Sequence, residues 1–345
     1  MSRLFNVAVV GATGAVGEVM LSVLAERKFP IREIVALASA RSAGKSVRFG
    51  DGEIVVHDLA TFDPEGIDIA LFSAGGAISK EYAPKFAAAG AVVIDNSSAF
   101  RYEDDIPLVV SEVNPEAIGR RPRGIIANPN CSTMQMLAAL APIHRAVGIE
   151  RINVATYQSV SGTGQRGIEE LRRQTAALVD IRASQDVHGA HAEVYPVQIA
   201  FNVIPHGGDF LDNGYTTEEM KLVWETRKIL GDDRIQVNAT VVRVPVYFGH
   251  SEAVHIETRE KITAAQARAL LEKAPGVEVV DERSGGGYPT PVTHAAGTDP
   301  VYVGRIREDI SHARGLDLWV VSDNIRKGAA LNAVQIAELV SKGYS

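Results

Sequence analysis

Short, almost continuously apolar runs alternate with helical patterns from Leu4 to about Pro129. The runs NVAVVG, EIVALAS, DIALFSA, AVVIDNS and GIIAN are typical of strands buried on both faces. Between them, AVGEVMLSVLAERK and KEYAPKFAAAG have helical spacing. Strands and helices that alternate in this way form a parallel sheet with crossover helices. We therefore expect an α/β, Rossmann-like parallel-sheet domain in this part of the chain.

The pattern changes after Arg151. Longer alternating strands, RINVATYQSV, RIQVNATVVRVPVYFG and AVHIETRE, are interrupted by the helical segments GIEELRRQTAALV and TAAQARALLEKA. This predicts an α+β domain with a mixed or antiparallel sheet. The last segment, RKGAALNAVQIAELVSKG, reads as one amphipathic helix that returns to the first domain. The expected domains are residues 1–130 with 325–345, and residues 131–324.

Composition limits the classes of partner. With 345 residues, of which 46% are hydrophobic, the chain can bury a large core. Its formal charge of −7 argues against nucleic-acid binding, which requires a basic face. Glycine interrupts the apolar stretches before they reach the length of a membrane helix, and the N-terminus lacks a signal pattern, so we expect a cytoplasmic protein with small-molecule partners.

A glycine loop follows the first predicted strand. In VAVVGATGAVGEVML, Gly11, Gly14 and Gly17 have GxxGxxG spacing between a strand and a helix. Glycines at such a turn allow close backbone approach, and the amides of the helix N-terminus can hold a pyrophosphate. Simple helix–strand packing is the alternative reading, but the order strand, turn, helix favours dinucleotide binding.

The end of the second predicted strand favours NADP over NAD. No acidic residue is present there to accept a hydrogen bond from a ribose hydroxyl; Ser39, Arg41 and Ser42 follow instead. A guanidinium and hydroxyl groups suit a 2′-phosphate. An exposed arginine without a ligand is the alternative.

The only cysteine, Cys131, occurs in NPNCST, where a strand gives way to a helix. A single cysteine cannot form an internal disulfide, and helix-end amides stabilise a thiolate, so a nucleophilic role is favoured over a structural one. Ser132 and Thr133 are candidate capping residues. Pro142, inside the helical pattern that follows, should kink or split the helix.

Several motifs together resemble one known family. GATGAVG, SSAFR, NPNCST, SGTGQRG, EEMK, RVPVYFGHSE and DNIRKGAALNAVQIAE occur in the order found in bacterial aspartate-β-semialdehyde dehydrogenase. The resemblance covers the chain from the first strand to the last helix. It implies NADP-dependent interconversion of β-aspartyl phosphate and aspartate semialdehyde with phosphate, in lysine, threonine and methionine biosynthesis. It also implies a homodimer formed through the second domain and no metal ion.

The resemblance also implies roles for individual residues. Cys131 would be the nucleophile, His250 the acid/base group, and Gln158 would position the thioester. The implied substrate-binding residues are Arg101, Asn130, Gln158, Glu218, Lys221 and Arg243, with Arg243 on the α-carboxylate and Arg101 and Lys221 on phosphate. Ser161, Gly162 and Asn324 match contacts to the nicotinamide end of the cofactor. Beside these we count Gly11, Thr13, Gly14, Ala15, Val16, Ser39, Arg41, Ser42, Ser73 and Gly75 as cofactor-binding residues.

Two alternatives remain open at the level of sequence. One is another phosphorylating aldehyde dehydrogenase, such as N-acetyl-γ-glutamyl-phosphate reductase or glyceraldehyde-3-phosphate dehydrogenase, although their cysteine neighbourhoods differ from NPNCST. The other is a non-catalytic NADP-binding paralogue that uses the same fold for interaction. The presence of Cys131, Gln158, Arg243 and His250 together argues against it.

Overall fold

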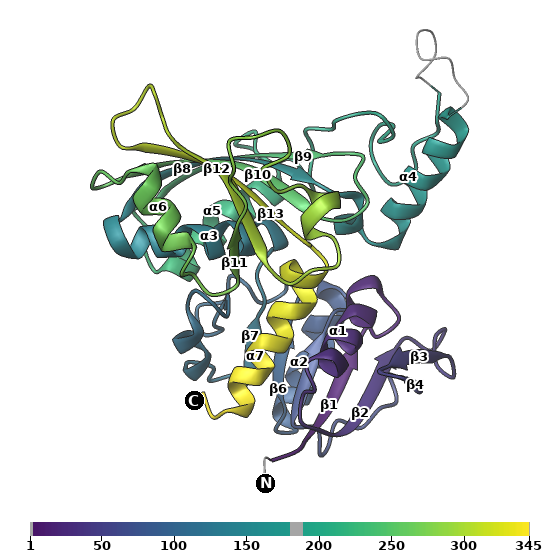
Figure 1. The fold of residues 1–345 in the computed structure, drawn as a ribbon. Helices are drawn as coiled ribbons and strands as arrows, with labels where there is room; N and C mark the ends of the chain where they lie inside the picture. Colours follow the sequence, from purple (N-terminus) through teal and green to yellow (C-terminus); the bar gives the residue numbers. More distant parts are fainter. Residues whose placement is uncertain (1–2, 180–188, 345) are drawn as a thin grey trace. The chain divides into compact units, whose positions relative to one another are not determined.

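The computed structural model describes residues 3–179 and 189–344, and it divides into two compact units (Figure 1). Unit 1 contains the chain up to Met134, Lys228–Gly231 and the chain from Arg326 onward. Unit 2 contains Gln135–Arg227 and Asp232–Ile325. The C-terminal segment therefore belongs to the same unit as the first strands, as the amphipathic pattern predicted.

Unit 1 is built on a sheet with the strand order β3-β4-β2-β1-β5-β6-β7. Its strands are β1 (Phe5–Val10), β2 (Ile31–Ala38), β3 (Ser46–Phe49), β4 (Gly52–Asp58), β5 (Ile69–Phe72), β6 (Val92–Asp95) and β7 (Ile125–Ala127). All neighbouring pairs are parallel except β3 and β4, which form an antiparallel hairpin at the edge. The parallel sheet confirms the prediction, whereas the edge hairpin was not anticipated.

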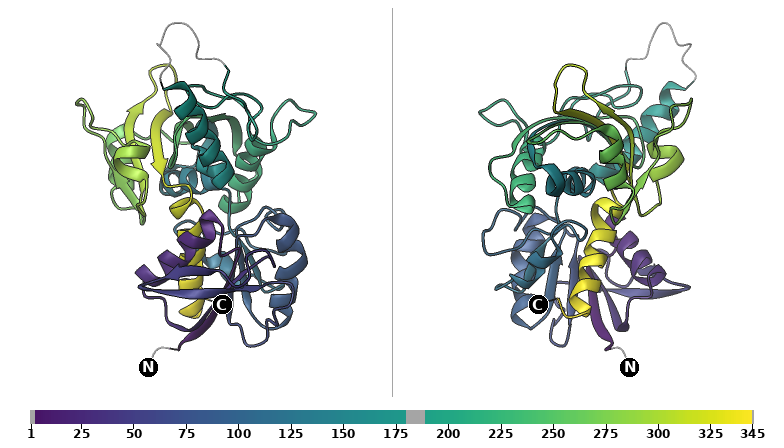
Figure 2. Two further views of the ribbon diagram at one scale, coloured as in Figure 1. Left: turned by 90° about the vertical axis from the view of Figure 1, so that its right-hand side faces the viewer. Right: turned by 60° about the vertical axis from the view of Figure 1, so that its left-hand side comes forward.

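Helices cover both faces of this sheet (Figure 2). They are α1 (Ala15–Glu26), α2 (Gly76–Ala88), the short 3₁₀ helix at Pro115–Gly119 and α7 (Asn332–Ser341). Side chains alternate between the two faces of the sheet along β5. Ile69 and Leu71 pack in one core with residues of α1 and α7. The ring centroid of Phe72 lies 5.3 Å from that of Phe86 in α2, on the other face. The C-terminal segment is not one uniform α-helix, because a wider π-helical turn, Arg326–Leu331, precedes α7.

Unit 2 has a six-stranded mixed sheet with the order β11-β12-β13-β10-β8-β9. Its strands are β8 (Ile149–Gln158), β9 (Gln236–Arg243), β10 (His250–Thr258), β11 (Val277–Val279), β12 (Val301–Glu308) and β13 (Gly315–Ser322). The pairs β8·β9 and β11·β12 are parallel and the other pairs are antiparallel, so the mixed-sheet prediction is confirmed. The strand expected over residues 234–249 ends at Arg243, just before Pro245, which cannot donate a ladder hydrogen bond.

The remaining helices are α3 (Cys131–Val147), α4 (Gln165–Leu178), α5 (Thr217–Leu230), α6 (Ala264–Leu271) and short turns at Val160–Thr163 and Pro291–Ala295. Residues of α3 and α5 are divided between the two units. The helix α3 continues through Pro142, so the expected split of this helix was wrong. Among the helices of residues 3–179 and 189–344, none has the length and apolar character needed to cross a membrane.

The acidic side chain of Glu252 is completely buried in unit 2. Glu252 lies on β10, between Thr156 of β8 and Val320 of β13. Burial raises the pKa of its carboxyl group well above the ordinary value, and the carboxamide of Gln135 opposes this shift only in part. The protonated acid is therefore the form that this core favours.

We expect Glu252→Gln to become progressively more stable, relative to the parent, as the pH rises above about 4.5. A group whose pKa is raised by folding stabilises the fold below its unfolded pKa, and this contribution is lost as the pH rises toward the folded pKa. The amide has the shape of the acid but does not titrate. Urea unfolding across a pH series, with exposed Glu278→Gln on β11 as the control, measures the difference. A difference that does not change with pH would contradict the buried, neutral carboxyl group.

Candidate active site

The glycine loop of unit 1 packs against the end of the neighbouring strand β5. Gly11 has φ +86°, and a Cβ atom at this position would lie 2.6 Å from the backbone oxygen of Ser73. The helix α1 then begins with Gly14 at its N-cap and no side-chain cap, so its first-turn amides face outward without a capping oxygen. The loop that follows β5 contains Ser73 and ends at Gly75, which has φ +88° and lies at the start of α2. This cradle fits a pyrophosphate that approaches backbone amides closely.

The predicted cofactor residues of unit 1 occupy three loops of its sheet. Thr13, Ala15 and Val16 belong to the loop and first turn after β1, and Ser73 and Gly75 follow β5. The group at Ser39, Arg41 and Ser42 follows β2, the strand beside β1. There the backbone N–H of Ser42 donates to the oxygen of Ser39 at 2.8 Å, and the Arg41 side chain is exposed. The strands β2, β1 and β5 are adjacent and parallel, so these loops share one edge of the sheet.

Cys131 is the first residue of α3 and carries a partly exposed thiol. The carboxamide oxygen of Asn130 accepts hydrogen bonds from the backbone N–H groups of Ser132 at 3.0 Å and Thr133 at 3.4 Å. Asn130 therefore caps the helix, and the expectation that Ser132 and Thr133 do so was wrong. Asn130 has the required position just outside the helix, whereas the other two already lie in its first turn.

Arg101 also belongs to unit 1 and is almost completely buried. Its Nη2 donates to the backbone oxygen of Asn96 at 2.8 Å, in the segment that follows β6. Its own backbone oxygen accepts a hydrogen bond from Nζ of Lys228 at 2.9 Å. These contacts hold a buried guanidinium in the same unit as Cys131.

Three predicted residues of unit 2 meet at one edge of its sheet. Gln158 at the end of β8 pairs in register with Arg243 at the end of β9. The first residue of β10, His250, lies at the same edge, because Ser251 pairs with Tyr157 on the other side of β8. The connection between Arg243 and His250 ends at Gly249 with φ +90°, which supplies the bend that their separation requires. Gln158 and Arg243 are 85 residues apart in the sequence, and Arg243 and His250 are 7 apart, yet all three lie at neighbouring strand ends.

The side chains of Arg243 and His250 converge on Gly162. A Cβ atom on Gly162 would lie 2.8 Å from Nη1 of Arg243 and 3.1 Å from Nε2 of His250. Both of these nitrogen atoms are buried, and neither has a hydrogen-bond partner in the described parts of the chain. Buried donors without partners are costly, so this arrangement favours a ligand that brings acceptor oxygens.

The ring of His250 is oriented by Ser159. The backbone N–H of Ser159 donates to Nδ1 at 3.0 Å, and the Ser159 hydroxyl lies at the same distance. Complete burial, followed by the charge of Arg243, lowers the pKa of His250 to about 3, so the ring is neutral near pH 7. A backbone N–H can only donate, so Nδ1 carries no proton and the proton of the neutral ring is on Nε2. Ser159 was not predicted from the sequence, although its position directly after Gln158 was a usable signal.

Asn324 connects the segment after β8 with the turn before His250. Its Oδ1 accepts hydrogen bonds from the hydroxyls of Ser159 at 3.0 Å and Ser161 at 3.1 Å, and from the backbone N–H of Gly249 at 3.0 Å. This residue therefore fixes the turn before His250 as well as the segment that contains Gly162.

Glu218 and Lys221 form a local ion pair on α5. Nζ of Lys221 lies 2.6 Å from Oε2 of Glu218, one helical turn away, and both side chains are largely shielded. The charge of Glu218 also opposes the lowering of the His250 pKa, so its carboxylate acts electrostatically on the histidine. Within residues 3–179 and 189–344, no group of three or more His, Cys, Asp or Glu side chains could hold a metal ion.

Comparisons with known proteins identify two family models that match this chain. Residues 6–121 match the family model described as semialdehyde dehydrogenase, NAD binding domain, and residues 140–327 match semialdehyde dehydrogenase, dimerisation domain. An aspartate-semialdehyde dehydrogenase of Legionella pneumophila is 62% identical over 347 residues, which cover 100% of this chain and 98% of the relative.

Two solved structures extend the comparison. Aspartate semialdehyde dehydrogenase II of Vibrio cholerae, complexed with ASA, is similar with a TM-score of 0.95, 57% identity and full coverage of both chains. The aspartate semialdehyde dehydrogenase of Candida albicans with NADP is similar with a TM-score of 0.76 and 25% identity, over 99% of this chain and 100% of the other. The chain therefore belongs to the aspartate-semialdehyde dehydrogenases of the semialdehyde dehydrogenase family, as an oxidoreductase with a nicotinamide-binding domain and a dimerisation domain.

Proposed function

We propose that the chain catalyses the reversible reductive dephosphorylation of β-aspartyl phosphate to aspartate semialdehyde, with NADP as its cofactor and a thioester on Cys131. The observation that carries this proposal is the convergence of Arg243 Nη1 and His250 Nε2 on Gly162, where two buried donors have no partner in the described residues. A small substrate with a carboxylate and a reacting carbonyl satisfies both donors. The Vibrio cholerae relative with bound ASA supports this substrate class. The product would supply lysine, threonine and methionine biosynthesis.

Cys131 acts as the nucleophile in this proposal. The partial positive charge at the start of α3 favours the thiolate over the thiol, and Asn130, as the cap, holds this first turn in place. In the biosynthetic direction Sγ attacks the acyl carbon, the bond from that carbon to the phosphate oxygen breaks, and phosphate leaves. NADPH, when bound, supplies the hydride that reduces the resulting thioester. Collapse of the thiohemiacetal then breaks the carbon–sulfur bond, which releases the aldehyde and regenerates the thiolate.

His250 acts as the acid/base group through Nε2. Because Ser159 occupies Nδ1, the neutral ring presents an Nε2–H donor, and this proton stabilises the oxygen on which negative charge develops. Gln158, beside Arg243 on the adjacent strand, positions the thioester. The low pKa of His250 keeps the ring in this donor form across the physiological range.

The charged residues divide between the two anionic groups of the substrate. The fork of Arg243 suits the α-carboxylate, and Glu218 assists in substrate binding. Arg101 and Lys221 bind phosphate, the leaving group in one direction and the nucleophile in the other. Asn130 contributes to the substrate site in addition to capping α3.

NADP binding rests on the cradle in unit 1. The backbone from Gly11 to Val16, with Ser73 and Gly75, suits the pyrophosphate, and Arg41 with its neighbouring serines suits the 2′-phosphate. In unit 2, Ser161, Gly162 and Asn324 contact the nicotinamide end. The Candida albicans relative with NADP supports this assignment. The dimerisation-domain match supports a homodimer formed through unit 2.

We expect the purified protein to reduce NADP with aspartate semialdehyde only when phosphate is present. Cys131→Ala should abolish this activity and leave NADP affinity within about threefold, because the thiol takes part in the covalent step alone. Absorbance at the NADPH band measures turnover, and a fluorescence titration measures cofactor binding. Activity of the variant within tenfold of the parent would contradict the thioester mechanism. Faster reaction with N-acetylglutamate semialdehyde or glyceraldehyde 3-phosphate would favour the other dehydrogenases.

Replacing Arg41 by glutamine should weaken NADP binding about tenfold to a hundredfold, the range for one charge-assisted hydrogen bond to phosphate. The affinity for NAD, which lacks the 2′-phosphate, should fall less than about threefold. Dissociation constants for both cofactors are compared at one salt concentration, because salt screens an exposed pair. Arg48→Gln, on the edge strand β3, is the matched control. Equal losses for NADP and NAD would remove Arg41 from the 2′-phosphate site.

Arg243→Lys should lower kcat/KM for aspartate semialdehyde at least about tenfold while the KM for phosphate stays near its parent value. Lysine retains the charge but cannot grip a carboxylate with two parallel hydrogen bonds. Lys221→Met should instead raise mainly the KM for phosphate. Saturation curves with each substrate varied separately distinguish the two residues. The reverse pattern would exchange their assignments.

A further inference from the structure

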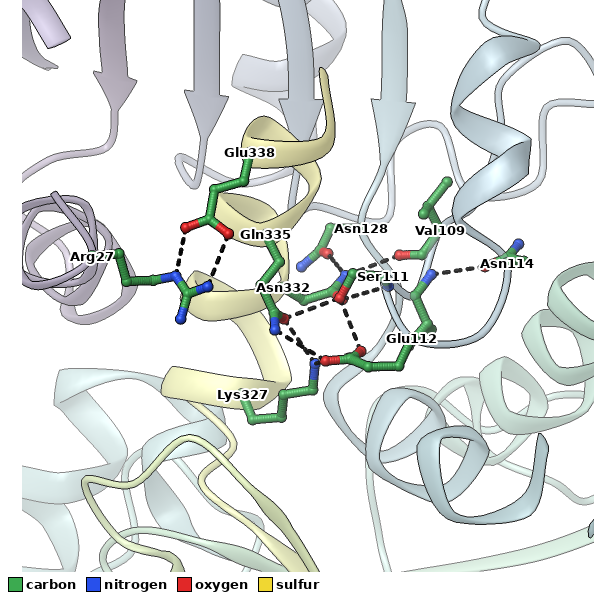
Figure 3. Close-up of polar contacts among 11 residues, drawn as sticks. Arg27, Val109, Ser111, Glu112, Asn114, Asn128, Lys327, Asn332, Gln335 and Glu338 are labelled. Atoms are coloured by element: carbon green, nitrogen blue, oxygen red, sulfur yellow. Dashed lines mark hydrogen bonds and ion pairs between the residues drawn. The ribbon is translucent and has the colours of Figure 1, made fainter. Parts of the chain in front are cut away.

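A buried carboxamide holds the segment before Cys131 from the C-terminal end of the chain (Figure 3). Asn332, the first residue of α7, is completely buried. Its Nδ2 donates to the backbone oxygen of Val109 at 2.9 Å and to Oδ1 of Asn128 at 2.5 Å. Its Oδ1 accepts hydrogen bonds from both the backbone N–H and the hydroxyl of Ser111 at 2.9 Å. Every donor and acceptor of this amide therefore has a partner.

Asn128 continues the network toward the nucleophile. It lies three residues before Cys131 and is also completely buried. Its Nδ2 donates to Oδ1 of Asn96 at 2.5 Å and to the backbone oxygen of Ala329 at 3.1 Å. The amide of Asn96 in turn donates to a backbone oxygen of β5 at 3.1 Å. Three carboxamides, Asn332, Asn128 and Asn96, thus form one continuous relay inside unit 1.

Backbone partners fix the direction of this relay. Oδ1 of Asn332 faces a backbone N–H, which can only donate, and Nδ2 of Asn128 faces a backbone oxygen, which can only accept. Rotating either amide by 180° would bring like groups together. The position of the Asn128 side chain is therefore determined by Asn332 on one side and Asn96 on the other.

A buried ion pair holds the C-terminal segment that carries these groups. Nζ of Lys327 donates to both carboxylate oxygens of Glu112, at 2.6 and 2.7 Å, and to Oε1 of Gln335 at 2.9 Å. Lys327 is only 1% exposed. Removing either charge would leave the other buried and unpaired, which destabilises a fold strongly. Variants of this pair would therefore report on folding, whereas a variant of the neutral Asn332 can report on the segment at residues 128–131.

We propose that Asn332 is a positioning residue for Cys131, acting through Asn128. The carboxamide of Asn128 is the contact by which the C-terminal segment holds the loop at residues 128–130. That loop carries Asn130, whose oxygen caps the helix that begins at Cys131. Loss of the Asn332 contact leaves the Asn128 oxygen without its donor, so the loop shifts and the Asn130 cap weakens. The first turn of α3, whose partial positive charge favours the thiolate, is then no longer held in place. The inference rests on the proposed function of Cys131 as the nucleophile.

The test compares two variants of α7. Asn332→Ala removes the first carboxamide of the relay. Alanine is a good helix former, so the helix itself is not disfavoured. Glu338→Ala is the matched control, because it breaks the ion pair of Glu338 with Arg27, 2.7 Å long, which anchors the same helix at its other end (Figure 3). Cys131 is the only cysteine, so alkylation of the whole protein by iodoacetamide reports on that thiol alone.

We expect Asn332→Ala to slow alkylation at pH 7 about tenfold, the factor for one lost hydrogen bond, and to shift the pH profile of alkylation toward higher pH. The turnover number kcat should fall by a similar factor while the KM for NADP stays unchanged. Glu338→Ala should lower the unfolding temperature and leave the alkylation profile in place. Asn332→Ser, whose shorter side chain lacks the Nδ2 donor to Asn128 but keeps a polar group, should behave like Asn332→Ala and serves if the alanine variant does not fold.

Two results would overturn the positioning role. One is a change of less than threefold in the alkylation rate of a folded Asn332 variant. The other is an equal slowing in Glu338→Ala, which would indicate general loosening of α7. Failure of the proposed function is recognised separately in the parent protein: aspartate semialdehyde would then give Cys131 no protection against alkylation.

Discussion

A partly buried guanidinium beside a neutral imidazole is the interaction on which the arrangement of unit 2 depends. Arg243 and His250 lie at the same edge of three adjacent strands, and the charge of the arginine adds to desolvation in keeping the histidine unprotonated. Both side chains direct toward Gly162 nitrogen atoms that have no hydrogen-bond partner in residues 3–179 and 189–344, and a larger residue would not fit at Gly162. The fold therefore maintains two donors that, in the proposed function, a substrate satisfies.

In unit 1, backbone geometry shapes the start of α1, and neutral amides hold the segment before Cys131. Gly11 and Gly14 leave the start of α1 uncapped by any side chain, which suits an anionic cofactor. The start of α3, by contrast, is capped, because Asn130 supplies a side-chain oxygen beside Cys131. The asparagine relay behind it uses no charge, so it can hold the loop rigidly without altering the electrostatics of the thiol.

Several features of the site were predictable because they depend on local order along the chain. The strand–glycine–helix sequence near Gly11 and the placement of Cys131 at a strand–helix junction are of this kind. The cap of α3 was assigned wrongly because the choice among Asn130, Ser132 and Thr133 depends on which residue has a non-helical backbone. The edge hairpin of β3 and β4 was missed, since short half-exposed strands lack the apolar runs that marked the buried ones.

By itself, the sequence determined the alternation that yields a parallel sheet, the change to a mixed sheet, the return of the C-terminal helix and the identity of the only thiol. Hydrophobic periodicity and residue type are sufficient for these features. Only the tertiary structure decided the protonation of His250, because complete burial and the charge of Arg243 lower its pKa, and Ser159, 91 residues away, fixes its tautomer. The contact of Asn332 with Asn128 spans 204 residues and was likewise decided by folding, since neither asparagine has a local partner that could fix its amide.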